Sequence, residues 1–186
     1  MYGILGEAES DTETLKVIIR RLVNNESLPV RQKGFDGFGD LLKKGASHLR
    51  LFAGLDVSRF VVCYDADRED PAKRRVEIVT QVVGPSGISG HNCVVVIPVQ
   101  AIEAWILADI QAVSRVFDWA PRPFDGNPEA IDDPKTHIER LSRMSNKRPR
   151  YAHVLHNKAI ARYLDLDRVR AQCASFRPLF DFVKAD

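Results

Sequence analysis

The stretch Arg59-Phe-Val-Val-Cys-Tyr-Asp-Ala-Asp-Arg68 decides the fold that we predict for this chain. Its apolar run, Phe60 to Tyr64, is short and unbroken, which is typical of a strand buried on both faces of a parallel sheet. The run ends at two carboxylates, Asp65 and Asp67. If strand geometry continues through Asp67, both side chains project together from the carboxyl end of the strand, where open α/β sheets bind their ligands.

The two carboxylates predict a metal site. Because carboxylates this close repel each other, a hard divalent cation that takes oxygen ligands, Mg²⁺ or Mn²⁺, would relieve the repulsion. The competing interpretation is that Asp65 caps the following helix while Asp67 is solvated in a loop. These residues alone do not decide between the two interpretations.

Apolar runs and helical periodicity predict an α/β fold, with a parallel sheet of about four strands flanked by helices. Strands are expected at residues 2–6, 60–64, 93–97 and 28–34, the last at an edge because Pro29 cannot donate to a ladder. Helices are expected at 12–23, 40–53, 71–83, 99–109, about 135–145, 154–164 and 173–184. We divide the chain into an α/β domain at 1–120, a proline-rich connector at 121–134 and a basic helical part at 135–186 packed on the same domain.

Charge is unevenly distributed along the 186 residues. The formal net charge is only +2, but residues 135–186 carry twelve basic side chains against five acids, so the first 134 residues are net acidic. An acidic α/β part followed by a basic helical part suits a site that holds metal while its neighbours bind a polyanion such as nucleic acid. Basic helices are also common as solvated faces, so this is a supporting observation.

Cysteine usage and the N-terminal sequence predict a cytoplasmic protein without a membrane partner. The three cysteines are odd in number and lack metal-ligand spacing, which suggests a reducing compartment. The N-terminal residues do not form a secretory signal, and no apolar run approaches the length of a membrane span. The glycine-rich stretch Gly34–Gly39 does not match a phosphate-binding loop, so we predict no nucleotide cofactor.

Two further acids are candidates for the same site. Glu7 follows the first predicted strand at the sheet edge assigned to Asp65, and the loop after it is expected to cap the next helix through Ser10 or Asp11. Glu103 lies in an apolar helical stretch, and the competing interpretation places it at a helix boundary facing water. His153 and His156 have the i, i+3 spacing of a metal-binding pair, but without an HExxH motif core or solvated histidines are the favoured interpretation.

Taken together, three motifs resemble the Toprim-like proteins, and in particular the DUF4276 family, which is related to the Toprim part of OLD-type nucleases. They are Glu7-Ala-Glu-Ser-Asp11, Asp65-Ala-Asp67 and Ile102-Glu-Ala-Trp-Ile-Leu-Ala-Asp109. The helical tail from Tyr151 to Leu166 is also similar, so the resemblance runs along almost the whole chain.

This resemblance implies a Toprim-like, Rossmannoid fold that acts on phosphodiesters. It implies Mg²⁺-dependent hydrolysis with Asp65 and Asp67 as metal ligands, while Glu7 either binds metal or acts as general acid or base. Glu103 would complete a second metal position. Secondary candidates are Asp11, which stands in the first motif, and Arg68, which is near enough in sequence to contact phosphate.

Two other functions compete with this nuclease hypothesis. Similar proteins are associated with phage-defence systems, so the chain is alternatively a non-catalytic or partner-dependent subunit of a complex with a separately encoded ATPase. A minor alternative is a HAD-like phosphatase, because Asp-x-Asp at a strand end is also how those enzymes present an aspartate nucleophile. Against it, the motif is expected on about the third strand rather than the first, and Arg68-Glu69 follows it.

Overall fold

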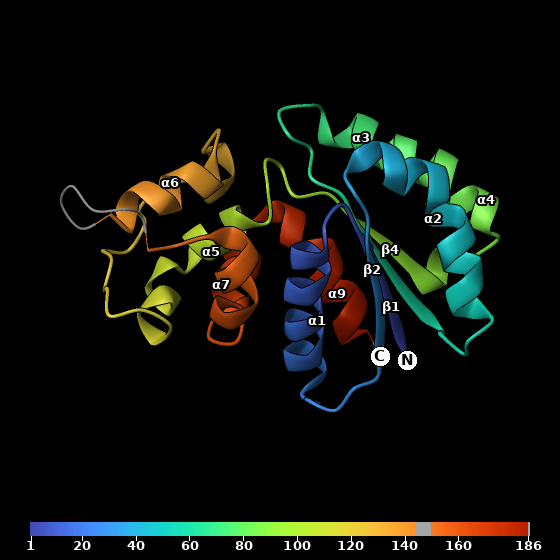
Figure 1. Cartoon of the computed structure of the whole chain (residues 1–186), viewed down its shortest axis with the longest axis horizontal. Helices are drawn as coiled ribbons and strands as arrows, with labels where there is room; N and C mark the ends of the chain where they lie inside the picture. The colour runs from blue at the N-terminus through green and yellow to red at the C-terminus, as the bar shows by residue number, and fades with distance from the viewer. Residues whose placement is uncertain (144–149, 186) are drawn as a thin grey trace.

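The computed structural model describes residues 1–143 and 150–185. Within these residues, four parallel strands form one sheet in the order β2-β1-β3-β4 (Figure 1). The strands are β1 (Tyr2–Gly6), β2 (Val30–Gly34), β3 (Arg59–Cys63) and β4 (Cys93–Val96). The predicted α/β class is therefore confirmed, as is the edge position of the strand that follows Pro29.

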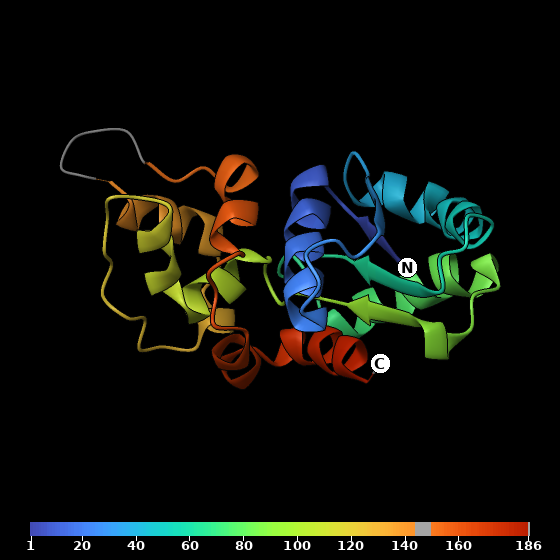
Figure 2. The ribbon, with the colours of Figure 1, turned by 90° about the horizontal axis from the view of Figure 1, so that it is seen from below.

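Helices cover both faces of this sheet, because successive strand side chains point to opposite sides. Ile4 and Val61 belong to one buried cluster, and their neighbours Leu5 and Val62 belong to the other. The first face is covered by α1 (Glu9–Val23) and α9 (Arg177–Lys184), and the second by α2 (Phe38–Ala53) and the helical stretch that starts with α3 (Pro71–Ile78) (Figure 2).

The winding of the chain creates a crevice between β1 and β3. These strands pair directly, yet the helix after β1 crosses one face of the sheet while the helix after β3 crosses the other. The loops after the two strands therefore separate and leave a gap at the carboxyl edge, which is where open α/β sheets place ligands. Glu7 follows β1 and Asp65 follows β3, so both lie at this point.

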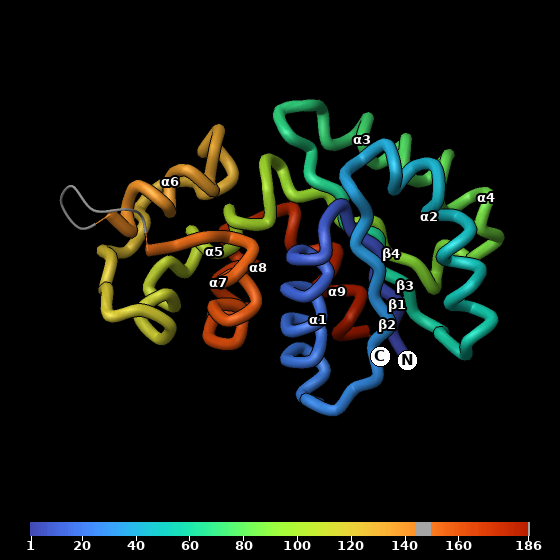
Figure 3. The backbone as a smooth tube through the Cα atoms, in the orientation of Figure 1, coloured from blue at the N-terminus to red at the C-terminus, as the bar shows by residue number. Residues whose placement is uncertain are grey.

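Most of the remaining helices lie beside α1 and share the core on that face, whereas residues 79–86 lie beside α2 on the other face (Figures 1 and 3). Ile138, Ile160 and Leu179 are fully buried in the same cluster as Ile4. The α-helices are α4 (Gly84–Ser86), α5 (Glu103–Ala108), α6 (Pro134–Leu141), α7 (His153–Ile160) and α8 (Leu166–Gln172). Shorter helical turns are η1 (Val79–Val83), η2 (Gly90–Asn92), η3 (Ile110–Arg115), η4 (Pro128–Ala130) and η5 (Ala174–Phe176). Among the described residues, no helix combines the length and the apolar character needed to cross a membrane.

Several predicted helix boundaries are wrong. The predicted helix at 99–109 begins only at Glu103, because Pro98 ends the strand and the chain first crosses the sheet edge. The predicted helix at 71–83 changes from α to π geometry after Ile78. No sequence pattern predicted α8, and the predicted end of the helix at 135–145 includes two positions that lie outside the described residues.

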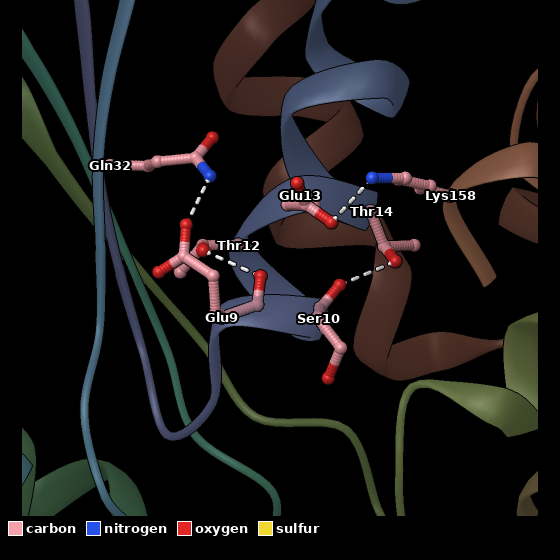
Figure 4. A network of polar contacts seen from close by, with 7 residues as sticks. All are labelled: Glu9, Ser10, Thr12, Glu13, Thr14, Gln32 and Lys158. Carbon is pink, nitrogen blue, oxygen red and sulfur yellow. Dashed lines mark hydrogen bonds and ion pairs between the residues drawn. The ribbon is translucent and has the colours of Figure 1, made fainter. Parts of the chain in front are cut away.

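The expected capping of α1 is also wrong, and Figure 4 shows what replaces it. The helix begins at Glu9 without a side-chain cap, so Ser10 and Asp11 lie inside its first turn. The Glu9 carboxylate accepts hydrogen bonds from Gln32 Nε2 at 2.6 Å and from the Gly34 amide at 3.1 Å, which ties the helix start to β2. Asp11 is therefore released from capping and belongs to the crevice.

Gly34 permits this close approach of β2 to the start of α1. A Cβ atom at this position would lie 2.2 Å from the Glu9 amide nitrogen and 2.5 Å from the Ala8 carbonyl carbon, and neither backbone atom can rotate away. We expect Gly34→Ala to lower the free energy of unfolding by about 2–4 kcal/mol, measured by urea denaturation.

Gly39→Ala is the matched control, because Gly39 lies in α2 and a Cβ there meets nothing within 4 Å. Its gain in helix propensity should leave the protein unchanged or more stable by up to about 1 kcal/mol. Equal effects of the two substitutions would contradict the steric role assigned to Gly34.

Candidate functional site

A pocket of about 400 Å³ occupies the crevice at the carboxyl edge of the sheet. Its carboxylate side is lined by Glu7, Asp65 and Asp67, which come from the loops after β1 and β3. Lys135, in the first turn of α6, closes it from the helical part of the chain. The pocket thus joins segments that are far apart in the sequence.

Strand geometry does not continue through Asp67, so the condition under which Asp65 and Asp67 would project together is not met. β3 ends at Cys63, and the backbone adopts the left-handed conformation at Asp67 and Arg68, with φ of 46° and 70°. Asp65 is buried as a result, whereas Asp67 and Arg68 are exposed at the pocket rim. Left-handed backbone at two consecutive non-glycine residues is strained, and such strain concentrates at functional sites.

Glu103 is the most deeply buried acid of the site, with none of its surface exposed. It does lie at a helix boundary, the start of α5, but its burial shows that the alternative in which it faces water is wrong. Asn157 of α7 donates from Nδ2 to Glu103 Oε1 at 2.9 Å, and Tyr151 Oη donates to Asn157 Oδ1 at 2.5 Å. This buried chain of hydrogen bonds fixes one carboxylate oxygen, while Glu103 Oε2 has no hydrogen-bond partner among the described residues.

Four carboxylates lie near enough to the Lys135 ammonium to attract its charge. Burial opposes its charge, but attraction to these carboxylates outweighs burial and raises the pKa of Lys135. They belong to Glu103, Asp65, Asp11 and Glu7. The structure therefore brings three of the four principal candidates together with Asp11, while Asp67 and Arg68 lie at the rim.

One ammonium does not balance four carboxylates, of which those of Asp65 and Glu103 are buried and those of Glu7 and Asp11 are partly exposed. Burial, followed by repulsion from Asp11, raises the pKa of Glu7 from 4.5 to about 7. Burial also raises the pKa values of Asp65 and Asp11, with repulsion from neighbouring acids second in both cases, and burial raises that of Glu103. The crevice thus favours neutral carboxyl groups and has a deficit of positive charge.

The donor set fits a hard divalent cation. Carboxylate oxygens are the ligands that Mg²⁺ prefers, and the unpartnered Glu103 Oε2 is an acceptor in a site short of positive charge. In the part of the chain that the structure describes, no three acidic, histidine or cysteine side chains lie close enough together to hold a metal ion. As the side chains stand, Lys135 supplies the neutralising charge.

The two histidines of α7 have separate environments. Ala152 N donates to His156 Nδ1 at 2.9 Å, and the His156 ring packs edge-on against Phe117, so this histidine is structural. Burial and then the positive charge of Lys135 lower the pKa of His153. His153 is therefore a neighbour of the carboxylate cluster.

Sequence reasoning missed Lys135 and Asn157. A signal for Lys135 was present, because Asp133 and Pro134 mark a helix start and a lysine in the first turn opposes the helix dipole unless an acid faces it. No such signal existed for Asn157, which stands among ordinary helical residues. Only the packing of α7 against α5 reveals that it holds Glu103.

Comparison with known proteins identifies a family and no characterised relative. A family model described as "Domain of unknown function (DUF4276)" matches residues 7–184. No curated protein and no solved structure matches the chain.

The raised pKa of Glu7 predicts a pH-dependent stability. Because the folded-state value lies above the ordinary 4.5, folding favours the protonated form, and this contribution is lost as pH rises from about 4.5 to about 7. Glu7→Gln mimics the neutral form. We expect it to raise the free energy of unfolding at pH 8 by about 1–2 kcal/mol, allowing for solvent screening of this partly exposed group, and by less at pH 5.

Urea denaturation with EDTA at both pH values measures this difference. The control is Glu26→Gln, because Glu26 is an exposed glutamate in the turn after α1. This substitution should change the free energy of unfolding by a similarly small amount at both pH values. A gain from Glu7→Gln that is the same at pH 5 and pH 8 would contradict the electrostatic explanation.

The hydrogen bonds of Asn157 predict a stability effect remote from the pocket surface. Asn157→Ala leaves both Glu103 Oε1 and the Tyr151 hydroxyl buried without a partner. We expect a loss of about 2–4 kcal/mol in the free energy of unfolding, measured by chemical denaturation. The exposed Asn92, substituted in the same way, should cost less than about 0.5 kcal/mol, and a similarly small loss for Asn157→Ala would be inconsistent with the buried chain.

Proposed function

The chain belongs to the DUF4276 family, and on that premise we propose that it is a Toprim-type, Mg²⁺-dependent phosphodiesterase that acts on nucleic acid. One observation carries the proposal. Carboxylates from separate elements gather with Lys135 in a crevice at the topological switch point of a parallel sheet. Such a cluster is costly to bury, and a purely structural role would not require it at a ligand-binding edge.

Asp65 and Glu103 would hold the cation, with Asp67 as a further oxygen donor at the pocket rim. Mn²⁺ has the same ligand preference and is expected to substitute. When bound, the metal ion supplies positive charge to the scissile phosphate and lowers the pKa of a coordinated water. Asn157 would keep the Glu103 carboxylate oriented, as the hydrogen-bond partners of metal ligands do.

Glu7 is suited to the proton transfer of the hydrolysis. A pKa of about 7 places it near neutrality, where a general base is both deprotonated and able to accept a proton. In the proposed reaction, the oxygen of water adds to phosphorus while Glu7 takes a proton from that water. The bond between phosphorus and the leaving oxygen then breaks, and the leaving oxygen takes up this proton from Glu7.

Basic side chains at the pocket would bind the phosphates of the substrate. Lys135 faces the carboxylate cluster from α6, and Arg68 and Arg74 line the pocket on the side of α3. Lys73 and Arg75 extend this positive region along exposed positions of α3. Contacts of this kind bind a phosphate backbone without reading its sequence, which favours nucleic acid as the substrate class.

The proposal predicts metal-dependent cleavage that depends on Asp65. We expect single-stranded DNA, RNA or plasmid substrates to be cleaved with Mg²⁺ or Mn²⁺ and not with EDTA. Asp65→Asn preserves the shape of a buried side chain and removes its charge, so the rate should fall about 100-fold or more. Cleavage is measured by gel electrophoresis of labelled substrates.

Asp125→Asn is the control, because Asp125 is exposed in the segment before α6 and remote from the carboxylate cluster in sequence. Its rate should equal that of the wild type. Failure of the wild-type protein to cleave any substrate with either metal would overturn the enzymatic proposal. It would favour the partner-dependent alternative, which a pull-down for a separately encoded ATPase then tests.

A further inference from the structure

The wall of the pocket that faces α3 is aromatic. The rings of Phe38 and Tyr64 stack with centroids 5.0 Å apart and planes only 4° from parallel. The Arg74 guanidinium lies 4.9 Å from the centroid of Phe38 and 5.0 Å from that of Tyr64. Tyr64 covers one face of Phe38, while Phe38 itself remains partly exposed and lines the pocket.

Three polar atoms of this wall are buried without a hydrogen-bond partner among the described residues. They are Tyr64 Oη, Arg74 Nε and Gln100 Oε1. All three residues line the pocket, and only 2% of the surface of Tyr64 is exposed. The ion pair between Arg74 and Glu77, at 3.1 Å, uses a terminal nitrogen of the guanidinium. It leaves Arg74 Nε without a hydrogen-bond partner among the described residues. Buried polar atoms are normally paired, so the residues of this wall have hydrogen-bonding capacity that the described residues leave unused and that a ligand would take up after small side-chain rearrangements.

The chemistry of the wall defines that ligand. Arg74 Nε donates, Gln100 Oε1 accepts, and the Tyr64 hydroxyl does either. A partner must therefore offer both donors and acceptors, and the aromatic surface beside them favours a flat ring. Nucleobases combine these properties, whereas a sugar or a bare phosphate has no aromatic face.

We propose that this wall is a subsite for one unpaired nucleobase next to the scissile phosphate, formed by Phe38, Tyr64, Arg74 and Gln100. This subsite rests on the function proposed for the adjoining carboxylates. The base stacks on the exposed part of Phe38 and pairs its edge with Gln100 and Arg74. A base within a duplex has its faces and its pairing edge occupied, so the subsite selects single-stranded nucleic acid. The volume of about 400 Å³ suits one nucleotide rather than a duplex.

Fluorescence anisotropy tests this subsite without requiring cleavage. Wild-type protein is titrated in Ca²⁺ against labelled short single strands of DNA and of RNA, against the same DNA backbone with abasic positions, and against a duplex. We expect the base-containing strands to bind about tenfold more tightly than the abasic strand. This ratio corresponds to the binding free energy of one base stacked on an aromatic side chain. Comparison of the DNA and RNA arms identifies which source of unpaired bases is preferred.

Substitutions at Phe38 assign the preference to this wall. Phe38→Leu keeps an apolar side chain but removes the aromatic face, and it should bring the ratio of base-containing to abasic affinity close to one. Phe38→Tyr retains the ring and should keep the ratio. Tyr163→Leu is the control, because Tyr163 is a half-exposed aromatic residue that follows α7 and lines a different pocket.

The outcomes separate the two proposals. Asp65→Asn should keep the preference for bases although it loses cleavage. A base preference without any cleavage supports the subsite and overturns the nuclease function. Equal affinity for base-containing and abasic strands, or an undiminished ratio in Phe38→Leu, overturns the subsite even if the wild-type protein cleaves nucleic acid.

Discussion

The partial or complete burial of four carboxylates near one ammonium is the constraint on which the rest of the structure depends. Glu7, Asp11, Asp65 and Glu103 all lose solvation, and Lys135 offsets only part of the cost. The packed sheet supplies the stability that tolerates this concentration of like charge, since both of its faces are covered by apolar helices. A site that is destabilising on its own but held by a rigid scaffold is characteristic of function.

The helical part of the chain is required to complete this site. It contributes Lys135 from α6. It also contributes Tyr151, just before α7, and Asn157 in α7, which together position the Glu103 carboxylate of α5. An ion pair of 2.9 Å between Lys158 and Glu13 links α7 to α1 at the surface (Figure 4), and apolar side chains join the two parts beneath it. Movement of α6 or α7 relative to the sheet would therefore change the charge balance of the crevice directly.

The two walls of the pocket suit two parts of one ligand. Carboxylates from the strand ends and Lys135 from α6 line one part of the pocket, and the stacked Phe38 and Tyr64 with Arg74 lie toward α3. In the proposed function, a phosphate with its metal ion would occupy the first part and a base the second. The turn through Asp67 runs between them, and its left-handed backbone directs Asp67 to the rim rather than into the cluster.

The sequence by itself determined the sheet, its edge strand and the meeting of Glu7 with Asp65, because local patterns predict parallel strands whose carboxyl ends share one edge. It could not determine where Asp67 points, since that depends on the turn after Ala66, nor could it place Lys135 and Asn157 in the site. These two residues meet Asp65 and Glu103 only through the packing of helices that are distant in the chain. Contacts of this kind leave no periodic pattern in the sequence, so only the tertiary structure decided the charge balance of the crevice.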